Sequence, residues 1–171
     1  MAIDALVKPF LLLPLFQGLK PLQLTEIVRR ADRIIYRPGD IIIEEDQVGE
    51  AAVVIVSGEA VRITGGDSDA AEPIAEGSMI GELAMLVETV HSSTIVARGT
   101  VKALRLTRTE MHALMAEDPR LADHLTQKIT ARLQRLAQEL RAVDQALADI
   151  MGIDPLVQAA VSQTYTAAPL H

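Results

Sequence analysis

The chain has 171 residues, a formal net charge of −7 and no cysteine. Its 49% hydrophobic and 23% charged residues are typical of one globular domain with a substantial core, and exclude a disordered chain. The negative charge and an aromatic content of 2% argue against general nucleic-acid binding, and the lack of cysteine excludes disulfides and thiolate zinc sites. A reducing, cytoplasmic location fits this composition.

Residues 1–31 are expected to form an N-terminal helical segment. A short helix is predicted at residues 2–7, and Pro21 suits the first turn of a second helix that runs to residue 31. Residues 11–16 between them are the most apolar run of the chain. This run is much shorter than the ~20 residues of a membrane helix, so we expect no membrane insertion.

Residues 32–106 consist of short β-rich runs separated by turn residues. Pro38 and Gly39 stand where a type II turn places proline and glycine, and the apolar run at residues 52–56 indicates a strand buried on both faces. The expected strands are residues 33–36, 41–44, 52–56, 60–64, 72–75, 94–98 and 101–106. Because no long helix separates them, the predicted fold is mainly β with flanking helices, an antiparallel jelly-roll β-barrel with one helical interruption at residues 81–86.

Residues 107–151 return to a helical pattern. Thr107 and Glu110 form a capping box for a helix through residue 115, and Asp118 with Pro119 starts a long helix that a glycine ends at position 152. Residues 152–171 are expected to form a short helix and a tail.

The long helix carries apolar residues in alternating steps of four and three, as in a coiled-coil seam. These residues are Ile129, Leu133, Leu136, Leu140, Val143, Leu147 and Ile150. The pattern favours a homodimer through residues 129–150, although its mixture of leucine and β-branched residues also suits higher oligomers. Packing of the same stripe on the chain's own barrel is the alternative.

Four stretches in this order resemble the cyclic-nucleotide-binding domain of catabolite activator proteins, kinase regulatory subunits and gated channels. They are LFQGL at 15–19, YRPGDIIIEE at 36–45, VSGEAV at 56–61 and IGELAMLVETVHSSTIVA at 80–97. The resemblance covers roughly residues 10–145. It implies a regulatory module that binds a cyclic nucleotide, cAMP or cGMP.

By resemblance, the phosphate-binding cassette of such domains falls on Gly81, Glu82, Leu83 and Ala84. Their backbone amides would hold the cyclic phosphate, and Glu82 would accept the ribose 2′-hydroxyl. Without the resemblance, Glu82 would be interpreted as a cap of the short helix. The chain departs from the family at two positions near this cassette. It has Met79 where an aromatic residue is frequent and Val90 where proline is usual.

The largest departure is at the arginine that pairs with the phosphate, because its place falls on His91. The small residues that follow the arginine are matched by Ser92, Ser93 and Thr94. Arginine carries a permanent charge and a fork of donors, whereas histidine has a pKa of about 6.5 and is mostly neutral at pH 7. Loss of one charged hydrogen bond, roughly 1.5–3 kcal/mol, weakens binding by about 10- to 100-fold.

His91 therefore has three interpretations. It lines a pocket that has lost its ligand, it binds an anion only when protonated, or a different cation such as Arg62 or Arg98 takes over the charge. We expect a regulatory or scaffold module that is degenerate at His91 and binds cAMP or cGMP weakly. The alternative is a working cyclic-nucleotide sensor that controls a partner or a fused effector.

A cupin-like metal enzyme is a second alternative, of a different class. Cupins need two or three histidines and a carboxylate in the barrel, and only His91 of the four histidines falls there. We therefore expect no catalytic residues and no metal site. We also expect no DNA binding by this chain, since residues 152–171 are too short for a helix-turn-helix and contain no lysine or arginine.

Overall fold

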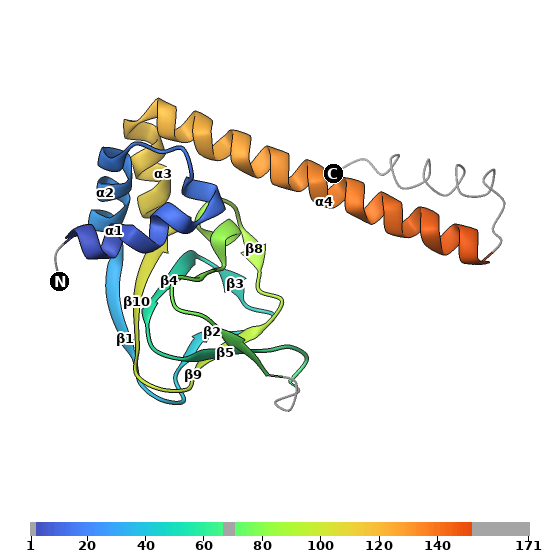
Figure 1. Cartoon of the computed structure of the whole chain (residues 1–171), viewed down its shortest axis with the longest axis horizontal. Helices are drawn as coiled ribbons and strands as arrows, with labels where there is room; N and C mark the ends of the chain where they lie inside the picture. The colour runs from blue at the N-terminus through green and yellow to red at the C-terminus, as the bar shows by residue number, and fades with distance from the viewer. Residues whose placement is uncertain (1–2, 67–70, 152–171) are drawn as a thin grey trace. The chain divides into compact units, whose positions relative to one another are not determined.

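The computed structural model describes residues 3–66 and 71–151. The chain divides into two compact units, residues 1–126 and residues 127–171. Figure 1 shows the elements in chain order. The helices are α1 (Ile3–Leu12), η1 (Pro14–Phe16), α2 (Pro21–Arg30), η3 (Glu82–Met85), α3 (Arg108–Glu117) and α4 (Pro119–Met151), of which η1 and η3 are 3₁₀ helices.

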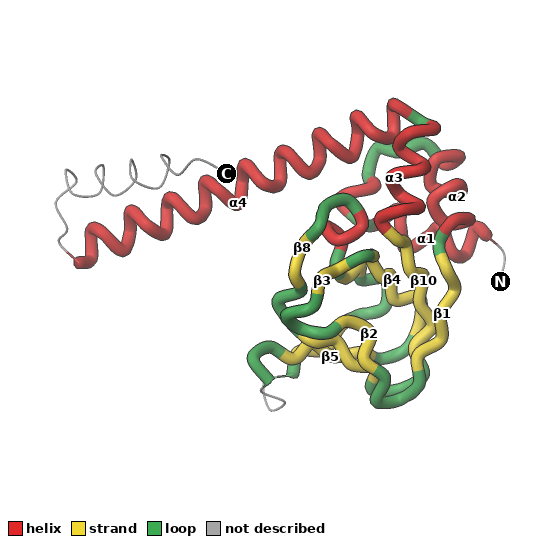
Figure 2. Tube along the Cα trace, turned by 180° about the vertical axis from the view of Figure 1, so that it is seen from behind, coloured by secondary structure: helices red, strands yellow, loops and turns green. Residues whose placement is uncertain are grey.

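The strands of the first unit form three antiparallel sheets (Figure 2). The strands are β1 (Asp32–Tyr36), β2 (Ile41–Ile43), β3 (Val48–Gly49), β4 (Ala51–Ser57), β5 (Ala60–Ile63), β6 (Glu72–Ile74), β7 (Met79–Ile80), β8 (Thr89–Val90), β9 (Thr94–Ala97) and β10 (Val101–Thr107). One sheet has the order β1-β10-β4-β7, the second has the order β2-β9-β5-β6, and β3 pairs with β8. The predicted jelly roll is thus confirmed, but these sheets do not close into one barrel within the described residues.

The core of the jelly roll lies between the two four-stranded sheets. Its buried residues include Ile43, Val53, Ile55, Ile95 and Ala103. The run at residues 52–55 is buried on both faces, as predicted, because the opposite face of the first sheet contacts the helices. That second apolar layer joins the buried side chains of β10 to those of α2 and α3.

Local turn chemistry behaves as the sequence indicates. Asp40 N donates a hydrogen bond to Arg37 O at 3.0 Å, and Gly39 has a φ of +90°, as a type II turn requires at this position. Thr107 Oγ1 accepts a hydrogen bond from Glu110 N at 3.2 Å, and Asp118 Oδ1 accepts one from Arg120 N at 3.0 Å. These side chains cap the first turns of α3 and α4.

Two helices, α1 and α3, are longer than predicted. The first helix continues through Pro9 to Leu12, although proline removes one backbone donor. Packing compensates, since Leu6 and Phe10 are buried and the rings of Phe10 and Phe16 lie 5.4 Å apart. The third helix, α3, ends two residues later than predicted. The short strands β3, β7 and β8 were not predicted, because two residues are too few to show a periodic pattern.

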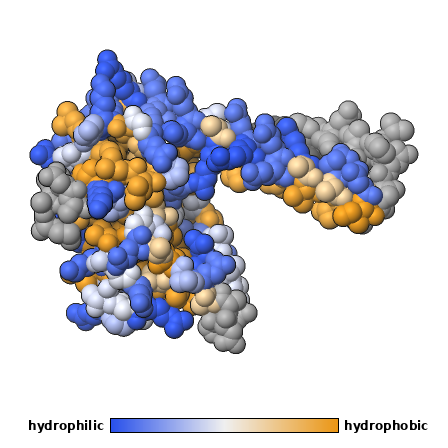
Figure 3. Space-filling view, viewed as in Figure 1, coloured by the Kyte–Doolittle hydropathy of each residue, from blue (hydrophilic) through white to orange (hydrophobic). Residues whose placement is uncertain are grey.

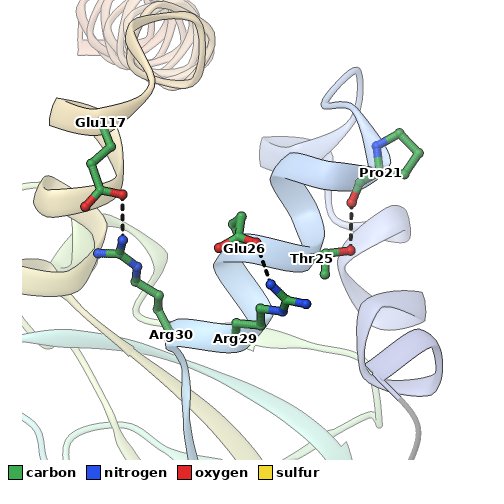
Figure 4. A network of polar contacts seen from close by, with 6 residues as sticks. All are labelled: Pro21, Thr25, Glu26, Arg29, Arg30 and Glu117. Atoms are coloured by element: carbon green, nitrogen blue, oxygen red, sulfur yellow. Dashed lines mark hydrogen bonds and ion pairs between the residues drawn. The ribbon is translucent and has the colours of Figure 1, made fainter.

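Polar contacts hold α3 against α2 (Figure 4). Arg30 lies at the end of α2, and its guanidinium pairs with Glu117 at 2.6 Å and with Glu110 at 3.6 Å. Gln23 Nε2 donates to Asp118 Oδ2 at 2.7 Å. This hydrogen bond is the main reason why the pKa of Asp118 is lowered. The start of α3 is thereby placed next to η3, which it contacts.

The part of α4 in the second unit carries an exposed apolar stripe, and a hydrophobic band follows this helix in Figure 3. The stripe consists of Leu133, Leu136, Leu140, Val143, Leu147 and Ile150. Helix α4 extends to Met151, the last described residue, and the predicted stop at position 152 lies outside the described residues. No helix in the described ranges is both long and apolar enough to cross a membrane. The elements predicted for residues 152–171 lie outside the described residues.

Candidate functional site

Residues 81–86, the glycine turn, form the only stretch where the β region becomes helical within the described part of the chain. Gly81 has φ 65° and ψ 32°, a left-handed conformation that favours glycine. A β-carbon at position 81 would also stand 3.2 Å from Ala51 O. Ala84 N donates to Gly81 O at 2.9 Å and Leu86 N donates to Leu83 O at 2.9 Å, which fixes the turn.

His91 is held next to this turn by its backbone. Its N–H donates to Gln47 O at 3.0 Å, and its carbonyl accepts from Asp46 N at 2.9 Å. Its ring lies against two glycines. A β-carbon at Gly49 would stand 2.7 Å from Cε1 of His91, and one at Gly81 would stand 3.2 Å from the same atom. The imidazole therefore occupies a space that exists only because both positions lack a side chain.

This environment affects the charge of the ring. Desolvation lowers the pKa of His91 below its usual value of 6.5. At neutral pH the imidazole is therefore uncharged, and it offers one donor where an arginine would offer a charged fork. The position that should neutralise a phosphate contributes no positive charge in the absence of a ligand.

The structure brings the candidate residues into one neighbourhood. Glu82, Leu83 and Ala84 form η3, directly after Gly81. Ser92 and Ser93 connect His91 to β9, and Ser92 is exposed whereas Ser93 is half-buried. Glu82 is half-buried and engaged in an interaction of its own. The assignment of these residues to a phosphate-binding cassette stays a prediction.

Of the two alternative cations, Arg62 is closer to the site than Arg98. Arg62 pairs in register with Ile95, a fully buried residue, and cross-strand partners point to the same face of a sheet. Arg62 therefore lies beside the start of β9, where its long side chain is exposed to solvent. Its guanidinium lies 3.7 Å from Glu72. Arg98 follows the opposite end of β9, roughly 13 Å along the strand from Thr94 at ~3.3 Å per residue.

His91 also lines a cleft of about 380 Å³ between β2, β4 and β10. Arg105 lines the same cleft, with Glu44, Glu50 and Tyr36. Arg105 is a third candidate cation, but its guanidinium lies 3.5 Å from Asp32 and two carboxylates share the cleft. Its charge is therefore already balanced. Burial raises the pKa of Tyr36 and keeps the phenol protonated at neutral pH.

Three residues at the site were missed by sequence reasoning. Gly49 was missed because β3 is too short to show a pattern. Arg108 Nη1 donates to Gly49 O at 3.1 Å and to Ala84 O at 3.3 Å, and His112 Nε2 lies 2.8 Å from Leu86 O. One signal pointed to Arg108, since a cation in the first turn of a helix opposes the helix dipole.

The described part of the chain contains no cluster of candidate metal ligands. No group of three or more His, Asp or Glu side chains there could hold a metal ion. His112 and His124 each form a hydrogen bond with a backbone carbonyl, Leu86 O and Leu15 O respectively. His171 lies outside the described residues.

Known proteins match this chain in sequence. The cAMP-dependent protein kinase regulatory subunit of Aspergillus niger is 35% identical over 95 residues, 56% of this chain and 23% of that protein. The Cyclic AMP receptor protein of Thermus thermophilus is 29% identical over 131 residues, 74% of this chain and 60% of that protein. The chain thus spans about a quarter of the kinase subunit's length.

Solved structures agree on the fold. The N-terminal domain of a transcriptional regulator from Streptomyces coelicolor superposes with a TM-score of 0.67 at 22% identity, over 77% of this chain and 94% of that one. The Thermus thermophilus Catabolite Activator Protein has a TM-score of 0.60 at 27% identity, over 77% and 63% of the two chains. The family description "Cyclic nucleotide-binding domain" matches residues 33–118, half of the sequence. With its jelly roll, glycine turn and flanking helices, this chain belongs to the cyclic nucleotide-binding domain family.

Proposed function

We propose that this chain is a regulatory or scaffold module whose nucleotide pocket is degenerate at the phosphate-pairing position, so that it binds cAMP and cGMP weakly at neutral pH. One observation carries the proposal. The ring of His91 fills the space beside Gly49 and Gly81, and desolvation lowers its pKa. A phosphate at the glycine turn would thus meet backbone amides but no fixed positive charge from position 91.

The remaining parts of the site have roles in this proposal. The amides at the start of the glycine turn would donate to the cyclic phosphate, while the Ala84 amide donates to Gly81 O within the turn. Glu82 would accept the ribose 2′-hydroxyl. Ser92 and Ser93 would contribute hydroxyl donors. An anion stabilises the protonated imidazole, so binding would raise the pKa of His91 and take up a proton. Affinity is therefore expected to increase as the pH falls.

The related proteins support a regulatory role. Their names describe a kinase regulatory subunit and a cyclic AMP receptor, and neither name assigns a catalytic role to this domain. We propose that this chain likewise reports to a partner or effector and has no catalytic activity of its own. The exposed stripe on α4 supports self-association through residues 129–150, since a single chain leaves these leucines in water.

Isothermal titration calorimetry with cAMP and cGMP at pH 7.5 and pH 5.5 tests the proposal. Wild type should bind weakly at pH 7.5 and several-fold more tightly at pH 5.5. The variant His91→Gln should lose this pH dependence, because glutamine does not titrate. His91→Arg should bind roughly 10- to 100-fold more tightly than wild type at pH 7.5, as expected for one regained charged hydrogen bond. Micromolar binding by wild type at pH 7.5 that His91→Gln leaves unchanged would contradict the proposal.

The second candidate function is a working sensor of cyclic nucleotides that uses Arg62 as the counter-charge. The register of Arg62 beside the start of β9 favours this candidate over one that uses Arg98. The same titration separates the two functions. A sensor should bind at pH 7.5 and lose affinity in Arg62→Met, whereas Arg98→Met should bind like wild type. In the degenerate module, Arg62→Met has no tight binding to lose.

A further inference from the structure

Helix α3 presents two side chains, one turn apart, to backbone carbonyls of the site. Arg108 and His112 are spaced i, i+4 and therefore lie on the same face of the helix. Arg108 Nη1 donates to Gly49 O at 3.1 Å and to Ala84 O at 3.3 Å. His112 Nε2 lies 2.8 Å from Leu86 O. A carbonyl can only accept, so this ring nitrogen carries the proton.

Two of these three carbonyls belong to the glycine turn, and the third belongs to Gly49, which lies against His91. Ala84 and Leu86 belong to the turn, where a four-residue 3₁₀ helix leaves its last carbonyls without partners in the helix. Gly49 belongs to β3. A β-carbon at Gly49 would stand 2.6 Å from Ala84 Cβ and 2.7 Å from the His91 ring, so Arg108 bonds the carbonyl of Gly49, which lies against this ring, and that of its neighbour Ala84.

The position of Arg108 conflicts with the local preference of its helix. It is the first residue of α3, where the helix dipole disfavours a cation. Residues that break a local rule are expected where a site requires them. Here the two carbonyl oxygens supply the favourable charge that the helix terminus does not. The cation is therefore explained by the glycine turn and not by the helix.

We propose that Arg108 and His112 are positioning residues for the glycine turn, fixing its carbonyls to α3 and so aiming its amides at a bound anion. This inference rests on the proposed nucleotide site for the identity of the anion, a cyclic nucleotide phosphate.

Amide hydrogen exchange of the ligand-free protein tests the positioning role. The N–H groups of Ala84, Leu86 and Val87 report on the turn, since they donate to Gly81 O and Leu83 O within it. In Arg108→Met these amides should exchange at least ~10-fold faster, the loss expected for hydrogen bonds from a charged group. Amides of the β4–β10 ladder should not change. Arg29→Met is the matched control, because it removes an arginine that pairs with Glu26 on α2 and donates to no carbonyl of the turn in the described contacts.

The second pair of variants keeps the test decisive if Arg108→Met does not fold. His112→Leu should accelerate exchange at Leu86 and Val87, and His112→Gln should restore protection because its amide can donate to Leu86 O. Equal exchange in Arg108→Met and Arg29→Met, or in His112→Leu and His112→Gln, would overturn the proposal.

A binding experiment in the His91→Arg background then connects positioning to the anion. Adding Arg108→Met should weaken cAMP binding at least ~10-fold at pH 7.5, and adding Arg29→Met should not. Unchanged affinity in the Arg108→Met double variant would contradict the role in aiming the amides. If His91→Arg itself binds no cAMP, the proposed nucleotide function fails, while the exchange measurements still decide the positioning role.

Discussion

The ring of His91 lies so close to Gly49 that a β-carbon at position 49 would stand 2.7 Å from its Cε1 atom. These residues are far apart in sequence, since Gly49 ends β3 and His91 directly follows β8, the strand that pairs with β3. Their contact determines both the room available to the imidazole and its desolvation. The uncharged state of His91 is thus a property of packing as much as of residue type.

Gly49→Ala is expected to destabilise the protein by about 1–3 kcal/mol, the usual cost of overpacking a filled site. The new methyl group would meet Ala84 Cβ at 2.6 Å and the His91 ring. Urea denaturation measures the change. Gly99→Ala is the matched control, since a β-carbon there meets nothing within 4 Å. Similar stabilities for the two variants would contradict the described packing. The double variant with His91→Ala should recover only part of the loss, because Ala84 remains.

Stability should depend on pH through His91. Its folded pKa is lowered by desolvation, so between that pKa and about 6.5 the unfolded chain binds more protons than the native one. The contribution of His91 is therefore fully present above pH 6.5 and declines as the pH falls through this window. The free energy of unfolding of wild type should decrease relative to His91→Gln between pH 7.5 and pH 5.5. Parallel pH curves for the two proteins would show that the ring is not desolvated.

The cap of α3 should contribute measurably to stability. Thr107→Ala removes the acceptor for Glu110 N and should lower the free energy of unfolding by about 1 kcal/mol. Thr107→Ser keeps a hydroxyl and should lose little. Thermal or urea unfolding checks both variants. An equal loss in the serine variant would assign the effect to the threonine methyl group and not to the cap.

Self-association should depend on the apolar stripe of α4. Leu140→Asp places a charge in the proposed seam and should weaken the dimer at least ~10-fold in Kd, since an unpaired charge there must be desolvated. Gln138→Asp adds the same charge to the same helix outside the stripe and should leave association unchanged. Sedimentation velocity over a concentration series measures both. A monomeric wild type, or equal dissociation of the two variants, would contradict the seam.

The sequence by itself determined the elements whose signals are local. Proline and glycine at positions 38 and 39 specify a type II turn, Thr107 and Asp118 specify two helix starts, and the steps of four and three specify the stripe on α4. The order of short strands was enough for a jelly roll, and the resemblance placed His91 beside a phosphate-binding turn. The turn, cap and stripe signals each depend on residues within about seven positions of one another, and the order of strands adds only their succession along the chain.

Only the tertiary structure decided what surrounds His91. Gly49 reaches its ring through a ladder of two residue pairs, too short for any periodic signal. Arg62 lies beside the start of β9 because it pairs in register with Ile95, and a shift of one residue would turn its side chain to the other face of the sheet. Arg108 and His112 reach the glycine turn across more than twenty residues of chain. Desolvation, counter-charge and hydrogen-bond partners all depend on such distant contacts, so they follow from the packed structure alone.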